Sequence, residues 1–530
     1  MAADRRSRAV GRTIPQAFEA AVAAYGDRIA LVSDGISCTF SELDRRANGV
    51  AHIASRRMVA RGERAGVLTG DRPAATAAFL GLCKAGMVSV LLRAGQPVPY
   101  LRTILDDAGA RLIFATREHR ALAESLRPGE GDVVDLDDDC LAPGEPPDRV
   151  SGPGDRIGIA YTSGSTGRPK GVVQTHRSTL AFVASYLTRT RLRREDRVAL
   201  LHDSRGMDLL ASLATGATVC CFPIDRRGLS GLADWLARQR ITVLPTVPSV
   251  LRHIVKALAG RREELSVRLI RLSGEVLTPG DLRQAAAVFP PSCRVMNWFG
   301  STEVAVASCT LPLEEMVRMS SIPAGRPLAG LRVRIEDPNG VETSGPGEIV
   351  VSSDSLFEGY WQRPDLDAQT LSPDPDRAGQ RRFRTRDAGY LDSSGRLVVV
   401  GRVDSQLKVN GYRVEAAEVE AALRSVSGIE DALVRLVRPG DDSDSALAAY
   451  VLTGEGEPPP VSFVRRELEK RIPRYMIPAY FARIDAIPRL VGGKPDRTAL
   501  PELVPSSRRE YNPLAPLKGV ASELSPPRDF

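Results

Sequence analysis

The residues with the clearest capacity for chemistry lie in one short loop, from Tyr161 to Gly171. The loop reads Tyr-Thr-Ser-Gly-Ser-Thr-Gly-Arg-Pro-Lys-Gly and follows an apolar run, residues 156–160, that predicts a buried strand. Its glycines let backbone N–H groups turn toward an anion, its hydroxyl groups add donors, and its lysine adds a mobile positive charge. The loop therefore favours phosphate binding, with an ordinary polar turn as the alternative. It is not a P-loop, because that motif needs Ser or Thr directly after the lysine.

Further polar groups that could take part in chemistry occur later in the chain. They are Phe-Gly-Ser-Thr-Glu at 299–303, Phe-Arg-Thr-Arg-Asp at 383–387, Gly-Arg-Val-Asp-Ser-Gln-Leu-Lys at 401–408 and Gly-Lys-Pro-Asp-Arg at 493–497. Each also has a simpler structural explanation. Glu303 could be a helix-start carboxylate, Asp387 a turn residue and Lys494 a solvated loop lysine.

The elements that must position these residues alternate between strands and helices. Apolar runs predict strands at residues 65–68, 89–92, 198–201, 241–244 and 294–297, and helical spacing predicts helices at 74–85, 207–214 and 250–258. This alternation indicates βαβ units and a mainly parallel sheet. From Gly330 on, short strand-like runs predict a β-rich subdomain.

A chain of 530 residues is too long for one compact core. We expect a flexible arm (1–14), an N-terminal core domain (15–403), a small C-terminal domain (404–500) and a disordered tail (501–530). Asn-Gly at 410–411 predicts a hairpin turn early in the small domain. The predicted fold class is α/β: a large N-terminal domain of parallel sheets flanked by helices plus a β-rich subdomain, with a small mobile α+β C-terminal domain.

Composition narrows the function classes. The chain is 43% hydrophobic and 26% charged, and its net charge of +7 is spread along its length without a basic block, which disfavours nucleic-acid binding. Seven scattered cysteines without a CxxC pair indicate neither zinc nor a disulfide framework. We expect no signal peptide, no membrane span and a cytoplasmic location, because no long apolar segment occurs.

The ordered set of motifs resembles the adenylate-forming superfamily, which includes acyl-CoA synthetases, luciferases and peptide-synthetase adenylation domains. The similar segments are 39–43, 84–86, 161–171, 299–303, 383–387, 401–408, 474–478 and 493–497. Within the superfamily, the chain most resembles a free-standing adenylation domain of the nonribosomal peptide synthetase type. Two residues depart from its motifs: Ser301 stands where the family has proline, and Arg386 stands where it has glycine.

The resemblance implies ATP and Mg²⁺ as cofactors and assigns roles residue by residue. It implies nucleotide contacts for Thr162, Ser163, Gly164, Ser165, Thr166, Gly167, Lys170, Phe299, Gly300, Asp387 and Arg402. Lys494 would bridge the substrate carboxylate and the α-phosphate, Thr302 would contact that phosphate, and Glu303 would bind the metal. Asp404 matches the family's hinge, about which the small domain rotates between adenylation and thiol transfer.

The same mapping predicts the substrate pocket. It would be lined by Asp203, Ser204, Met207, Pro245, Ile270, Leu272, Trp298, Val306 and Ala307. In amino-acid-activating relatives an aspartate at the position of Asp203 pairs with the substrate's α-ammonium, which offsets the cost of burying a carboxylate. His202 fits a competing alignment with acyl-CoA synthetases, and Asp203 could also be a loop or capping residue. Because the rest of the lining is apolar and Trp298 fills volume, we expect a small or compact uncharged amino acid.

The sequence therefore predicts an enzyme that makes an aminoacyl-adenylate and pyrophosphate from an amino acid and ATP. It would then transfer the acyl group to the phosphopantetheine thiol of a separate carrier protein, or to coenzyme A. An acyl- or aryl-CoA synthetase is one alternative. A catalytically impaired scaffold is another, because Arg386 and Ser301 depart from the family motifs.

Overall fold

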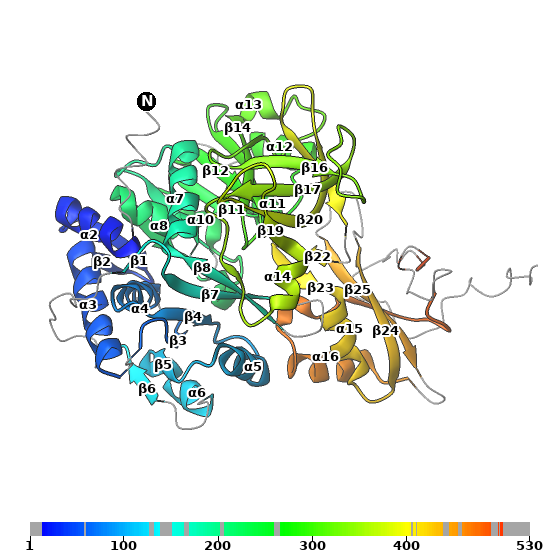
Figure 1. Cartoon of the computed structure of the whole chain (residues 1–530), viewed down its shortest axis with the longest axis horizontal. Helices are drawn as coiled ribbons and strands as arrows, with labels where there is room; N and C mark the ends of the chain where they lie inside the picture. The colour runs from blue at the N-terminus through cyan, green and yellow to red at the C-terminus, as the bar shows by residue number, and fades with distance from the viewer. Residues whose placement is uncertain are drawn as a thin grey trace, which may run out of the picture. The chain divides into compact units, whose positions relative to one another are not determined.

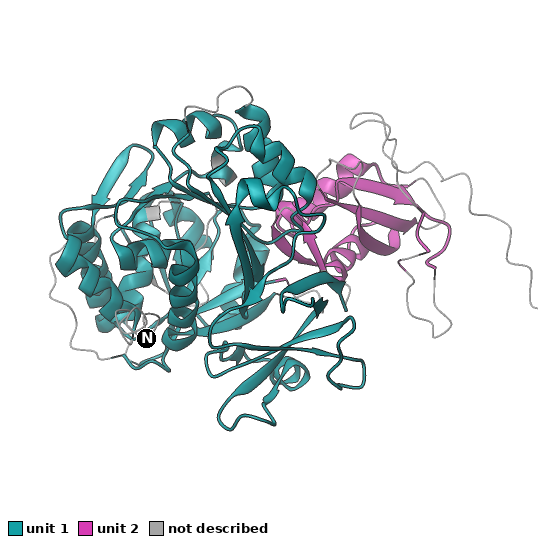
Figure 2. Cartoon of the chain, turned by 90° about the horizontal axis from the view of Figure 1, so that it is seen from above, with its two compact units in different colours: residues 1–162, 169–404 teal, residues 163–168, 405–530 magenta. Residues whose placement is uncertain are grey.

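The computed structural model describes fourteen segments of the chain. They are residues 13–57, 60–70, 72–126, 132–137, 151–163, 169–201, 206–258, 265–403, 406–409, 411–437, 445–453, 458–488, 497 and 499–501. The chain divides into two compact units: residues 1–162 with 169–404, and residues 163–168 with 405–530 (Figure 2).

The largest sheet of the first unit has nine strands, several of which are labelled in Figure 1. Its order is β15 (Arg326–Pro327), β14 (Ala305–Pro312), β13 (Arg294–Gly300), β12 (Leu269–Leu272), β11 (Val243–Thr246), β9 (Arg197–Leu200), β10 (Thr218–Cys221), β1 (Ile29–Ser33) and β2 (Ile36–Thr39). The strands from β13 to β1 are parallel, so their carboxyl ends share one edge. Strands buried on both faces need apolar side chains throughout, which explains the short apolar runs of the sequence.

A second sheet in this unit has seven strands. Its order is β18 (Gly359–Tyr360), β8 (Lys170–Thr175), β7 (Arg156–Thr162), β4 (Val88–Leu92), β3 (Arg64–Leu68), β5 (Leu112–Ala115) and β6 (Asp132–Asp135). The strands from β7 to β6 are parallel, while β8 and β18 are antiparallel additions at one side.

Helices cover both faces of each sheet. In the first unit they are α2 (Ile14–Tyr25), α3 (Phe40–Arg57), α4 (Arg72–Lys84), α5 (Val98–Ala108), α6 (Arg120–Ser125), α7 (His176–Thr190), α8 (Met207–Thr215), α9 (Ile224–Arg227), α10 (Leu232–Arg238), α11 (Pro248–Ala257), α12 (Pro279–Ala286), α13 (Leu313–Met316) and α14 (Pro364–Thr370). Helices α2, α7 and α8 share a core with one face of the nine-stranded sheet, and α10 to α13 share a core with the other. Helices α3 and α4 lie between the two large sheets and contribute to the cores of both.

A third sheet gives the first unit a β-rich subdomain. It runs β16 (Arg332–Glu336), β17 (Gly347–Ser353), β20 (Arg381–Leu391) and β19 (Leu371–Pro373), with β21 (Leu397–Arg402) paired to β20. All of its strand pairs are antiparallel. The predicted α/β class with a β-rich subdomain is confirmed.

The second unit is a small α+β module. It contains the hairpin β22 (Gln406–Val409) and β23 (Tyr412–Glu415), the sheet β24 (Ile429–Val437), β25 (Ala446–Thr453) and β26 (Tyr480–Arg483), and helices α15 (Ala416–Arg424) and α16 (Val461–Glu469). Gly411 has a φ of +81°, as a tight turn between β22 and β23 requires. An apolar core of its own, with Val414, Leu423 and Leu468 fully buried, holds the unit together.

Candidate functional site

A tight turn after β13 places Glu303 in the protein interior. The Ser301 N–H donates to the carbonyl oxygen of Val304 at 2.8 Å, and the Ser301 hydroxyl accepts from the Glu303 N–H at 3.3 Å. Gly300 is needed because a Cβ there would lie 2.6 Å from the Val304 oxygen. Serine therefore fits this turn, in which its own N–H, a group that proline lacks, makes a hydrogen bond.

The Glu303 carboxylate lies next to an aromatic hydroxyl and a lysine. Glu303 is fully buried, and the Tyr360 hydroxyl donates to its Oε1 at 2.8 Å. Tyr360 on β18 pairs with β8, where the buried Lys170 begins the strand and places its Nζ 5.2 Å from the centre of the Tyr360 ring. Tyr360 thus contacts both the Glu303 carboxylate and the Lys170 ammonium group and fixes their positions. A negative and a positive group fixed in this way can bind a ligand that carries both phosphate and a metal ion.

Thr162 adds a hydroxyl group beside Lys170. The two residues are register partners at the ends of β7 and β8. The Thr162 Oγ1 atom is buried and has no hydrogen-bond partner among the described residues. Buried hydroxyl groups are seldom left unsatisfied, so this atom fits a ligand such as a phosphate oxygen. Ser163, also buried, donates from its hydroxyl to the carbonyl oxygen of Arg413 in the same unit at 2.7 Å.

Asp387 is held by Arg402 across two neighbouring strands. The residues are register partners on β20 and β21, and the Arg402 Nη1 atom lies 2.8 Å from the Asp387 Oδ1 atom. The Asp387 N–H donates to the Thr385 hydroxyl at 2.7 Å, so both the backbone and the side chain of Asp387 are fixed. A buried carboxylate oriented in this way can accept hydrogen bonds from the hydroxyls of a sugar.

Arg386, which stands where the family motif has glycine, has a backbone conformation that glycine favours. Its φ is +58°, in the left-handed region. Its N–H donates to Glu348 at 3.0 Å and its carbonyl oxygen accepts from the Val403 N–H at 2.8 Å, which holds the residue there. The Arg386 side chain reaches Gln369 on α14 at 3.1 Å in an exposed position. The departure from the family motif is therefore accommodated by the strand itself.

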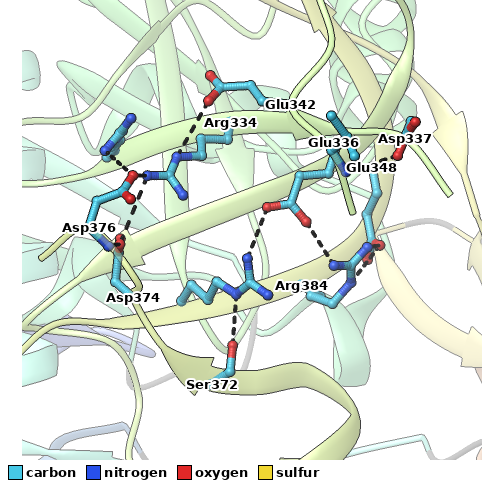
Figure 3. A network of polar contacts seen from close by, with 12 residues as sticks. Arg334, Glu336, Asp337, Glu342, Glu348, Ser372, Asp374, Asp376 and Arg384 are labelled. Atoms are coloured by element: carbon cyan, nitrogen blue, oxygen red, sulfur yellow. Dashed lines mark hydrogen bonds and ion pairs between the residues drawn. The ribbon is translucent and has the colours of Figure 1, made fainter. Parts of the chain in front are cut away.

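A network of ion pairs supports this strand (Figure 3). Arg384 on β20 binds Glu336 on β16 at 2.8 Å and Glu348 on β17 at 2.6 Å. Because Glu348 also accepts from the Arg386 N–H, the network fixes Arg384 and Arg386, which precede Asp387 on β20.

The structure distributes the predicted substrate pocket over three apolar cores. Met207 and Trp298 pack on the face of the nine-stranded sheet that α7 and α8 cover. Ile270 and Leu272 are fully buried on the opposite face of that sheet. Val306 and Ala307 lie in the core that the first unit shares with its β-rich subdomain. Neighbouring strand residues point to opposite faces. Arg271, rather than its two apolar neighbours, therefore shares a face with its register partner Pro245.

Arg271 belongs to a buried polar cluster that the sequence analysis missed. Its Nη2 donates to Asp208 on α8, its Nη1 donates to the Ser273 hydroxyl, and the Tyr186 hydroxyl of α7 donates to the other Asp208 oxygen. Burial, together with the Asp208 charge, holds the pKa of Tyr186 well above its ordinary value. Tyr186 also packs edge-on against Trp298, with ring centres 5.6 Å apart. An arginine within an otherwise apolar strand was the one sequence signal for this cluster.

Several predicted site residues lie outside the described residues. They are Gly164, Ser165, Thr166, Gly167, Asp203, Ser204, Asp404 and Lys494. In the part of the chain that the structure describes, no three His, Cys, Asp or Glu side chains gather as a metal-binding group. Mg²⁺ suits the remaining donor set, because it takes one or two carboxylates and completes its shell with phosphate oxygens and water. Nor does any described helix have the length and apolar character required to span a bilayer.

Comparison with known proteins gives consistent matches. Residues 18–361 match the family described as AMP-binding enzyme. Tyrocidine synthase 3 of Brevibacillus parabrevis is 30% identical over 537 residues, which cover 98% of this chain and 8% of that protein. The chain thus spans a small part of this curated relative.

Two solved structures share the fold. One is an artificially fused adenylation–PCP di-domain from Klebsiella oxytoca (TM-score 0.77, 23% identity, 88% of this chain and 92% of that one). The other is a double mutant of o-succinylbenzoate CoA synthetase from Bacillus subtilis (TM-score 0.77, 23% identity, 91% and 97%).

Proposed function

Because the chain belongs to the AMP-binding enzyme family, we propose that it adenylates a small or compact uncharged amino acid at the expense of ATP. The products are an aminoacyl-adenylate and pyrophosphate. The acyl group then passes to the phosphopantetheine thiol of a carrier protein. The likeness to tyrocidine synthase 3 and to an adenylation–PCP di-domain supports the amino acid and the carrier.

The buried arrangement of Thr162, Lys170, Tyr360 and Glu303 carries the proposal. In adenylation a carboxylate attacks the α-phosphorus of ATP, so both reactants are anions and catalysis consists mainly of positioning and charge neutralisation. The Lys170 ammonium neutralises phosphate charge. The Thr162 hydroxyl, which has no partner among the described residues, donates to a phosphate oxygen. Tyr360 keeps the Glu303 carboxylate oriented.

Glu303 would hold Mg²⁺, which when bound would supply positive charge to neutralise the phosphates. Asp387, locked by Arg402, accepts hydrogen bonds from the ribose hydroxyls. Thr302 contacts the α-phosphate, and Lys494 bridges that phosphate and the substrate carboxylate.

ATP–pyrophosphate exchange tests the proposal directly. Wild-type protein should catalyse exchange with an amino acid. Lys494→Ala should lower the exchange rate by about 100-fold or more, because it removes a positive charge that stabilises the negative charge developing in the transition state. Lys470→Ala is the matched control, since the Lys470 side chain is exposed and pairs with Glu467. Equal exchange in wild type and Lys494→Ala would refute the catalytic role. Exchange only with acids that lack an amino group would instead identify an acyl- or aryl-CoA synthetase.

A further inference from the structure

A small cavity lies at the carboxyl ends of β9, β11 and β12. Leu200, Leu201, Pro245 and Val247 give it an apolar wall, and Asp208, Thr246, Arg271 and Ser273 give it a polar one. The buried Thr246 hydroxyl also has no partner among the described residues, and like any hydroxyl it can donate to an acceptor on a ligand. Open parallel sheets bind ligands at this edge. Strand β12 pairs with β13, which ends at Gly300, and Glu303 follows shortly after. The cavity and Glu303 therefore both follow the carboxyl ends of parallel strands in the same sheet.

The polar wall presents an unused hydrogen-bond donor. Arg271 donates to Asp208 and Ser273 through its two terminal nitrogens, whereas its buried Nε has no partner among the described residues. The arginine side chain is only 11% exposed, so water reaches it poorly. A buried donor without an acceptor is costly, and a ligand with an acceptor at this point removes that cost.

The acceptors of the same cluster are already engaged. One Asp208 oxygen accepts from Tyr186 and the other from Arg271. Arg271 and Asp208 also cancel each other's charge. A second carboxylate in the cavity would leave a net negative charge in a buried place, which is expensive. A hydrocarbon group would leave the Nε donor unsatisfied.

We propose that Arg271, positioned by Asp208 and Tyr186, selects a carboxylic acid whose distal part carries a neutral hydrogen-bond acceptor, namely a hydroxyl, carbonyl or carboxamide oxygen. The inference rests on the proposed adenylation function and narrows its substrate class. Arg271 is the specificity-determining residue, and Asp208 and Tyr186 are positioning residues.

Matched acids test the proposal in ATP–pyrophosphate exchange. The sets are leucine, asparagine and aspartate; methionine, glutamine and glutamate; valine and threonine; phenylalanine and tyrosine; and the same compounds without the amino group. In the preferred set, we expect the amide or hydroxyl member to exceed its hydrocarbon and carboxylate counterparts by about 10- to 100-fold in kcat/KM.

A variant that removes the whole cluster keeps the test independent of folding. Tyr186→Phe/Asp208→Leu/Arg271→Met leaves no buried charge unpaired, and such apolar replacements of ion pairs are well tolerated. We expect this variant to retain exchange with the hydrocarbon member and to lose the preference, with a ratio near one. The control Asp196→Asn/Arg268→Met removes an Arg–Asp pair at the start of β12 and should leave the preference unchanged.

A thermal-shift assay with the same acids separates the two proposals. A rise in Tm with the polar acid but no pyrophosphate exchange would support the selective role of Arg271 and overturn the proposed adenylation. Exchange with a hydrocarbon or carboxylate as the best substrate, or an unchanged preference in the triple variant, would overturn the role of Arg271 alone. No shift and no exchange with any acid would overturn both.

Discussion

At the scale of single residues, Arg386 shows how the chain tolerates an unusual side chain. A positive φ costs residues with a Cβ roughly 1–2 kcal/mol. Here the Arg386 N–H donates to Glu348 and the Arg386 carbonyl oxygen accepts from the Val403 N–H, and these bonds hold the backbone in place. The Arg386 side chain ends at Gln369. Nothing in this arrangement requires a loss of activity.

Replacement of Arg386 by two small residues tests this explanation. Arg386→Gly and Arg386→Ala both remove the contact with Gln369, but only glycine relieves the strain. The glycine variant should therefore unfold with a free energy about 1 kcal/mol higher than the alanine variant. Urea unfolding of the two proteins measures the difference. Equal stability, or a more stable alanine variant, would mean that the backbone is not strained at this position.

At the scale of elements, His176 joins the first residue of α7 to the start of α2. Its Nδ1 accepts from the Ile14 N–H at 3.1 Å, which requires the neutral ring. Burial lowers the pKa of His176 to about 4, although nearby Asp155 opposes the shift. Above its ordinary pKa near 6.5 the ring is neutral in both the folded and the unfolded chain.

The lowered pKa predicts a pH-dependent stability. Between about pH 6.5 and pH 4 the unfolded chain binds a proton at His176 and the folded chain does not, so stability is lost as pH falls. The loss attributable to this residue is about 3 kcal/mol. His176→Asn keeps an acceptor for Ile14 but cannot titrate, and its unfolding free energy should fall less over this range. Parallel pH curves for the two proteins in urea unfolding would rule out the assignment.

The elements also show what sequence could and could not predict. The alternation of strands and helices was predicted because parallel strands are apolar on both faces. Because both faces of such a strand are apolar, the sequence does not show which face of the sheet each side chain lies on. In β12, Leu269, Ile270 and Leu272 give no alternation signal, so the sequence alone did not show on which face Arg271 lies. The pocket residues Ile270 and Leu272 were assigned from the family resemblance and remain a prediction. The partner that explains Arg271 is Asp208, 63 residues away in the sequence and visible only in the fold. A strand was predicted at residues 241–244, whereas β11 is Val243–Thr246 and continues through Pro245.

At the scale of the whole molecule, the chain folds as two units with separate apolar cores. Glu303, Asp387 and Arg402 belong to the first unit. The resemblance to the adenylate-forming superfamily implies that Lys494 takes part in adenylation. It also implies that rotation about Asp404 withdraws Lys494 for transfer to a thiol.

A proline at this boundary tests whether rotation separates the two half-reactions. Proline fixes φ near −65° and removes the N–H, so Asp404→Pro should restrict the backbone change that rotation demands. We expect pyrophosphate exchange to persist, while transfer of the acyl group to coenzyme A or to a carrier thiol falls at least about tenfold. Asp404→Ala removes the carboxylate and leaves φ free, so it should support both reactions. If the proline variant transfers as fast as wild type, the hinge does not lie at Asp404. If the alanine variant also loses transfer, then transfer depends on the Asp404 carboxylate and not on the freedom of the backbone at this position.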